Sequence, residues 1–91
     1  HRAKDSDEAK KLVAPFKSDP MLLRKHIQAA YDVLIKMKQV DPSRTACMGY
    51  CFGGTASLEF ARSGAPIKGA ISFHGNLATS RPEDARKIKA K

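Results

Sequence analysis

The sequence has 91 residues and a formal net charge of +8, with 42% hydrophobic and 29% charged residues. This length allows one small domain at most, and the composition is that of a globular chain. The basic surplus raises the prospect of a nucleic-acid partner, but the lysines are spread along helix-like segments without interleaved aromatic residues, so we interpret it as a solvated face and expect no nucleic acid. No apolar run could span a membrane and the first residues do not resemble a secretory signal, so we expect no membrane partner and a cytoplasmic location.

Two helices are expected in the first half of the chain. Asp5 or Ser6 can cap a helix over residues 7–14, which we expect Pro15 to end. Asp19 followed by a proline is a strong helix start. Apolar residues then recur at helical spacing and predict a helix over residues 20–39. Its apolar stripe comprises Leu23, Ile27, Ala30, Tyr31 and Leu34, and its solvent side includes Arg24, Lys25, Gln28, Asp32 and Lys36.

The second half predicts a strand, a helix and a second strand. Residues 45–50 form a short apolar run with little alternation, as in a parallel strand covered on both faces. A helix over residues 53–63 follows, with Gly64 as its C-terminal cap, and a second strand is expected over residues 67–73. Residues 80–90 predict a weak helix, with Ser80 and Glu83 as a possible capping box. Glu83 and Asp84 are interpreted as residues that favour the N-terminus of this helix.

The motif GYCFGG at positions 49–54 joins the first strand to the helix after it. A nucleophile between glycines at a strand-to-helix turn is the pattern of the nucleophile elbow of α/β-hydrolases, here with Cys51 in place of serine. Side chains at Gly49, Gly53 or Gly54 would be expected to collide with the neighbouring strand or helix. The same pattern also serves ordinary packing in parallel sheets, so the motif alone does not decide between a catalytic turn and a structural one.

The segments on either side of this motif favour a catalytic turn. The segment DPSR at 41–44, the GYCFGG turn, the helix end ARSGAP at 61–66 and ISFHG at 71–75 together resemble the dienelactone hydrolase family. The resemblance runs from about Ser6 to the last residue and implies part of an α/β-hydrolase fold. It implies that Cys51 is the nucleophile and that the Phe52 backbone N–H is one oxyanion donor. The implied activity is hydrolysis of a carboxylic ester or lactone, without a metal or an organic cofactor.

The family resemblance also implies what lies outside this stretch. In the family, the first strands come before a segment such as this one, and the acid and histidine of the triad come after it. We therefore expect the chain to be the central part of one larger domain, with little turnover by itself. Two parallel strands leave open sheet edges, so we expect partners in the remainder of that domain or in other copies of the chain.

Other roles for the cysteines and histidines are less favoured by the sequence. Cys47 and Cys51 should lie roughly 13 Å apart along a strand, beyond the ~7 Å that a disulfide spans, so Cys47 is interpreted as a buried small hydrophobe. A zinc site from both cysteines with His26 and His74 lacks ligand spacing and is not expected. His74 could pair with Cys51, but it follows the very next strand, so we favour a turn histidine; His26 is interpreted as a surface or packing residue.

Two further functions remain open on the residues alone. The glycine-rich turn could cradle an anion, although the dinucleotide and P-loop fingerprints fail at Cys51 and Thr55 respectively. Cys51 could also be a thiol that responds to oxidation. A small ester or lactone remains the favoured partner, and an anionic one would suit the basic surplus of the chain.

Overall fold

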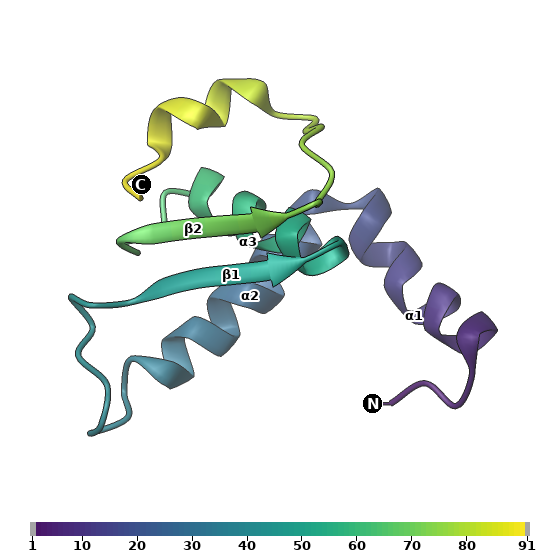
Figure 1. The fold of residues 1–91 in the computed structure, drawn as a ribbon, viewed down its shortest axis with the longest axis horizontal. Helices are drawn as coiled ribbons and strands as arrows, with labels where there is room; N and C mark the ends of the chain where they lie inside the picture. The colour runs from purple at the N-terminus through teal and green to yellow at the C-terminus, as the bar shows by residue number, and fades with distance from the viewer. Residues whose placement is uncertain (1, 91) are drawn as a thin grey trace.

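The computed structural model describes residues 2–90 and contains the expected strand–helix–strand unit. Figure 1 shows the two strands side by side, with helices behind them. Within the described residues no helix is long and apolar enough to cross a bilayer. The elements are, in chain order, α1 (Ser6–Ser18), α2 (Pro20–Leu34), β1 (Ala46–Tyr50), α3 (Phe52–Arg62), β2 (Gly69–Phe73) and the 3-10 helix η1 (Pro82–Lys87).

The predicted helix starts are confirmed, and two predicted ends are wrong. Asp5 accepts a hydrogen bond from the Glu8 N–H at 2.8 Å, and Asp19 caps α2 in the same way. Pro15 does not end α1, which continues to Ser18 with the proline inside it. The fixed φ of proline is itself compatible with a helix. Beyond Leu34 the chain continues through i→i+3 turns instead of as an α-helix, which makes α2 shorter than predicted.

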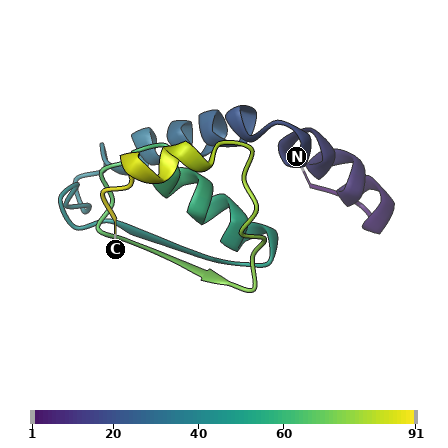
Figure 2. The same ribbon diagram turned by 90° about the horizontal axis from the view of Figure 1, so that it is seen from above.

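The sheet consists of β1 and β2 in parallel, with Ala46 opposite Gly69 and Tyr50 opposite Phe73. Both strands begin slightly later than predicted. The expectation that both faces are covered is wrong for residues 2–90, since α2, α3 and η1 all lie on the same side of the strands (Figure 2). The other face exposes four large apolar side chains, which we call the bare sheet face: Met48, Tyr50, Ile71 and Phe73.

The core lies between the sheet and the helices. Tyr31 of α2 and Phe60 of α3 meet edge to face with ring centroids 5.3 Å apart. Ala61, Ala65 and Ile67 complete this buried cluster. The predicted apolar stripe of α2 is therefore confirmed at Leu23 and Tyr31, which are buried, but not at its C-terminal end: Ala30 and Leu34 are exposed.

An ion-pair cluster fastens α2 to the elements that follow the site, and here the prediction for Arg24 was wrong. Arg24 is buried, and it donates from Nε to Glu59 of α3 at 3.0 Å and from Nη1 to Asp84 of η1 at 2.7 Å. A buried charge requires such partners, and these lie 35 and 60 residues further along the chain, out of reach of a helical pattern. Asp84 was likewise misassigned. Its side chain is buried, and the bond from Arg24 lowers the pKa of its carboxyl group.

The 3-10 helix η1 replaces the weak helix predicted over residues 80–90. Its N-terminus has no side-chain cap, so the capping box predicted from Ser80 and Glu83 does not form. Gly64, by contrast, has a φ of 86° directly after α3, as predicted for a C-terminal glycine.

Candidate active site

Cys51 is the single residue between β1 and α3, and its backbone is strained. Its φ of 53° and ψ of −121° lie outside the regions that side-chain-bearing residues ordinarily adopt. The Cys51 N–H still continues the sheet by donating to the Phe73 carbonyl at 2.9 Å. The turn therefore reverses the chain within one residue and leaves the Cys51 side chain exposed beyond the end of the strand.

Glycines allow the strand and the helix to approach so closely. A Cβ at Gly49 would fall on the backbone of Gly53, and a Cβ at Gly54 would fall on the Ser72 hydroxyl. A Cβ at Gly75 would lie 2.6 Å from the Thr55 nitrogen. The predicted collisions are thus confirmed at Gly49 and Gly54 but not at Gly53, around which no atom lies within 4 Å of an added Cβ.

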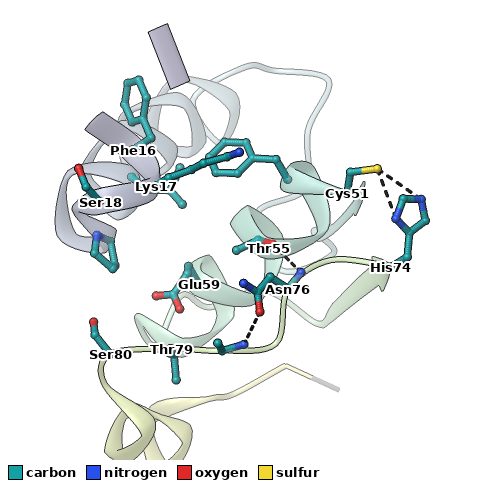
Figure 3. Close-up of a pocket in the computed structure, with 14 residues that line it drawn as sticks. Phe16, Lys17, Ser18, Cys51, Thr55, Glu59, His74, Asn76, Thr79 and Ser80 are labelled. Atoms are coloured by element: carbon teal, nitrogen blue, oxygen red, sulfur yellow. Dashed lines mark hydrogen bonds between the residues drawn. The ribbon is translucent and has the colours of Figure 1, made fainter. Parts of the chain in front are cut away.

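His74 meets Cys51 at the end of the sheet. It follows Phe73 as Cys51 follows Tyr50, and these two strand-end residues are register partners. The Cys51 Sγ lies 3.3 Å from both Nδ1 and Nε2 of the His74 ring (Figure 3). His74 also has a positive φ, of 44°. The structure therefore places it in a turn, as favoured from the sequence, and also against the thiol, which that interpretation did not expect.

The sulfur does not point along either ring nitrogen. The N–H and lone-pair directions of the two nitrogens lie in the ring plane and diverge, so one atom equidistant from both cannot be in line with either. The sulfur consequently packs across the ring. Both side chains are exposed, which leaves the imidazole free to turn about its Cβ–Cγ bond and present one nitrogen to the sulfur.

A cavity of about 650 Å³ opens beside this pair. It lies between the end of α1, the start of α2, the first turns of α3 and the loop after β2 (Figure 3). Lys17 contributes a cation to its wall and also lies over the Phe52 ring, 6.0 Å from the centroid. The lining residues are Phe16, Lys17, Ser18, Pro20, Leu23, Cys51, Phe52, Thr55, Glu59, His74, Asn76, Ala78, Thr79 and Ser80.

The wall of the cavity formed by residues 76–80 is held by polar contacts with α3. Thr55 Oγ1 accepts a hydrogen bond from the Asn76 N–H at 2.9 Å, and Arg62 donates to the Leu77 carbonyl at 3.0 Å. Arg62 also pairs with Glu59 at 2.9 Å, so the buried carboxylate in the cavity wall is paired with Arg62 and Arg24. These hydrogen bonds hold the loop of residues 76–80 in place as one wall of the cavity.

Of the other residues singled out in the sequence, Phe52 lies at the site, whereas Cys47 and His26 lie away from it. Phe52 is the first residue of α3, and no side chain caps this helix, so the N–H groups of its first turn have no capping partner. Cys47 and His26 lie outside the cavity lining. Cys47 is half-buried and donates to the Ser57 carbonyl, and burial raises the pKa of its thiol. His26 packs edge-on against Phe16, and both cysteines are free, as predicted.

No metal centre is formed within residues 2–90, where no three His, Cys, Asp or Glu residues gather in a way that could hold an ion. The site residues that sequence reasoning missed are Lys17, Glu59, Thr55 and Asn76. They come together because the end of α1 and the loop after β2 border the same cavity as α3. His74 had a usable signal, because two parallel strands that end together bring the residues after them together.

Comparisons with known proteins agree with this geometry. A family model described as dienelactone hydrolase family matches residues 1–91. An uncharacterized protein of Caenorhabditis elegans is 38% identical over 56 residues, which are 60% of this chain and 35% of that protein. The chain therefore spans about a third of the length of this relative.

Two solved structures superpose closely and confirm the expected partial α/β-hydrolase fold. One, titled m3DLH, has a TM-score of 0.86 and 36% identity over 98% of this chain and 37% of its own. The other is a dienelactone hydrolase-like promiscuous phosphotriesterase from metagenomic libraries, with a TM-score of 0.86 and 36% identity over 94% of this chain and 36% of its own. This chain belongs to the dienelactone hydrolase family.

Proposed function

We propose that Cys51 is the nucleophile of a hydrolase that acts on carboxylic esters or lactones. The observation that carries the proposal is the strained backbone of Cys51, with φ 53° and ψ −121°, beside a cavity of about 650 Å³. Strain of this kind costs on the order of 1–3 kcal/mol and persists where the surrounding structure enforces it, which is typical of functional sites. The family membership supports a nucleophile elbow at the same position.

The proposed reaction has two steps. The Cys51 thiolate attacks the carbonyl carbon, a C–S bond forms, and the ester C–O bond breaks as the alkoxide leaves and takes up a proton. Water then attacks the resulting thioester, which releases the carboxylic acid and restores the thiol. A lactone follows the same course, except that its alcohol stays attached to the acyl group.

The start of α3 supports the charge that develops in this reaction. Phe52 N–H belongs to an uncapped first turn directly behind Cys51, where backbone dipoles favour negative charge. We assign it as one donor to the oxyanion, in the role that the family resemblance implies. Gly49, Gly53 and Gly54 form the tight turn that brings this helix end to the sulfur.

The proposal also covers the charge of the substrate. Lys17 in the cavity wall favours an ester or lactone with a negative charge, because an ammonium group there attracts a carboxylate. The acid and the histidine that the family resemblance implies would come from the rest of the domain, as would the other walls of the pocket. Two free thiols suit a reducing compartment, so a cytoplasmic location forms part of the proposal.

Acylation by an activated ester tests this function. The protein is mixed with p-nitrophenyl acetate, and the intact mass and peptide map are recorded before and after hydroxylamine treatment, which cleaves thioesters. We expect one acetyl group on Cys51 in the wild type and in Cys47→Ala, and none in Cys51→Ala. A thiol that forms a sulfenic acid with peroxide but is not acylated would favour the redox function instead.

A further inference from the structure

We propose that Arg62 is a positioning residue that holds the loop of residues 76–80 against α3 and thereby favours acyl groups longer than acetyl. The inference rests on the proposed function and deepens it, because it assigns the part of the cavity that selects the acyl chain. Arg62 is the last residue of α3 and lies outside the cavity lining. It therefore acts through the loop and not by contact with the substrate.

The loop of residues 76–80 has little apolar packing of its own. Four of its five residues are exposed, and Thr79 is partly buried. Its large apolar residue, Leu77, is 69% exposed. Burial of apolar surface therefore contributes little to the position of this loop, which depends on polar contacts instead.

Two hydrogen bonds recorded in the described part of the chain join this loop to α3. Arg62 Nη2 donates to the Leu77 carbonyl at 3.0 Å, and the Asn76 N–H donates to Thr55 Oγ1 at 2.9 Å. A third bond, from the Ala78 N–H to Asn76 Oδ1, is internal to the loop and supports its shape. Loss of the Arg62 bond should leave the loop attached to α3 at its first residue alone.

The guanidinium of Arg62 is held on its other side by a buried carboxylate. Its Nη1 lies 2.9 Å from Oε1 of Glu59, whose side chain is 4% exposed. The second oxygen of Glu59 accepts a hydrogen bond from Arg24 Nε at 3.0 Å, so the carboxylate is fixed as well. Because a guanidinium is planar and rigid, one nitrogen on Glu59 fixes the direction of the other, here toward the Leu77 carbonyl.

The loop forms one wall of the cavity beside Cys51. Figure 3 shows it running from the His74 end of the site, past Thr55 and Glu59, to Ser80. An acetyl group on the Cys51 sulfur is too short to follow this wall, whereas a longer acyl chain can extend along it. Each methylene group that the fixed loop covers favours the longer chain. The loop contributes four of the lining residues: Asn76, Ala78, Thr79 and Ser80.

The test compares Cys51 acylation by p-nitrophenyl acetate and p-nitrophenyl hexanoate, followed by p-nitrophenol release and intact mass. Arg62→Lys keeps the charge beside Glu59 but lacks the fork that reaches the Leu77 carbonyl at the same time. Arg44→Lys is the matched control, because Arg44 also pairs with a carboxylate three residues earlier but is exposed. We expect the hexanoate-to-acetate ratio of rate constants to fall about tenfold in Arg62→Lys, the effect of roughly two uncovered methylene groups. The ratio should stay unchanged in Arg44→Lys.

The outcomes separate this inference from the proposed function. If the ratio is unchanged in Arg62→Lys, the inference is overturned, while acylation of Cys51 by acetate leaves the nucleophile assignment standing. Equal slowing with both esters also overturns it, since that indicates a general loss of structure. If neither ester acylates Cys51 in the wild type, the proposed function fails and the inference fails with it.

Amide hydrogen exchange tests the attachment of the loop without any ester. The N–H groups of Asn76 and Ala78 are both hydrogen-bonded in the wild type. We expect them to exchange several-fold faster in Arg62→Lys, whereas the amides of α2 should keep their wild-type rates. Equal exchange of the loop amides in the two proteins would overturn the inference.

Discussion

Cys51 and His74 occupy equivalent positions at the ends of two adjacent parallel strands, and the Cys51 sulfur lies 3.3 Å from both nitrogens of the His74 ring. The register that pairs Tyr50 with Phe73 places the next two residues side by side. Both then leave the sheet with a positive φ. The site is thus a consequence of strand register as much as of the glycine-rich turn.

The turn should tolerate a methyl group at one glycine and reject it at another. Gly49→Ala places a methyl group on the Gly53 backbone and should lower the free energy of unfolding by about 2 kcal/mol or more. Gly53→Ala meets open space in the first turn of α3 and should raise it by about 0.5 kcal/mol. Urea denaturation of both variants measures the difference. Equal effects of the two substitutions would show that the turn is not packed as described.

The two cysteines should differ in reactivity. Burial raises the pKa of the Cys47 thiol, which leaves less thiolate at neutral pH, whereas Cys51 is exposed at the start of a helix. With limiting iodoacetamide at pH 7, Cys51 should therefore be alkylated at least about tenfold faster than Cys47, since the thiolate is the reactive form. Peptide mapping by mass spectrometry gives both rates in one sample. Preferential labelling of Cys47 would contradict the placement of these thiols.

Arg24 should be among the most sensitive positions outside the site. Arg24→Leu removes the cation that Glu59 and Asp84 share. Arg62 still pairs with Glu59, and Arg81 and Lys87 still pair with Asp84, so we expect a loss of about 1–3 kcal/mol, the cost of hydrogen bonds removed from buried groups. Lys25→Leu, at the next and exposed position, serves as the control and should change stability by less than about 0.5 kcal/mol. Chemical denaturation measures both variants, and a neutral effect of Arg24→Leu would contradict the cluster.

The pH dependence of stability should carry the signature of Asp84. The Arg24 hydrogen bond lowers the pKa of Asp84 in the folded state below its ordinary value of 3.8. This stabilisation is present above that ordinary value and is lost as pH falls through the lower, folded-state pKa. The stability difference between wild type and Asp84→Asn should therefore shrink from pH 5 toward pH 2. Asp41 also has a lowered pKa, through Ser43, but it is common to both proteins. A difference that stays constant with pH would contradict the assignment.

The bare sheet face should promote association between copies of the chain. Met48, Tyr50, Ile71 and Phe73 are each between 41% and 60% exposed on one side of the strands. Sedimentation velocity should show larger species as the concentration rises, and Ile71→Lys should reduce them because it places a charge in this face. A monomer at all concentrations in the wild type would remove the basis for this prediction.

The parts of the fold that depend on nearby residues were predictable. Asp19 caps α2 because its carboxylate reaches N–H groups two and three residues away. The strand–turn–helix around Cys51 follows from the local requirement for glycine. In contrast, the end of α2 depends on i→i+3 turns over residues that still have a helical pattern, and α1 continues through Pro15 to Ser18.

Features that depend on distant partners were not predictable in this way. Arg24 has the sequence pattern of a solvent-facing helical residue, and only the arrival of Glu59 and Asp84 makes its burial possible. Lys17 enters the cavity wall because α1 folds toward the turn after β1. His74 is an intermediate case. Its early place in the chain favoured a turn residue, whereas the equal ends of β1 and β2 place it beside Cys51.

Attack by Cys51 on a carboxyl carbon is tested most directly by the intact mass of the protein after reaction with a strained β-lactone. Attack at the carbonyl retains the whole lactone, so we predict one adduct of the full lactone mass on Cys51 that hydroxylamine removes. Cys47→Ala should form the same adduct and Cys51→Ala should form none. An adduct that resists hydroxylamine, which marks attack at the alkyl carbon, or an adduct that persists in Cys51→Ala would contradict attack by Cys51 at the carbonyl.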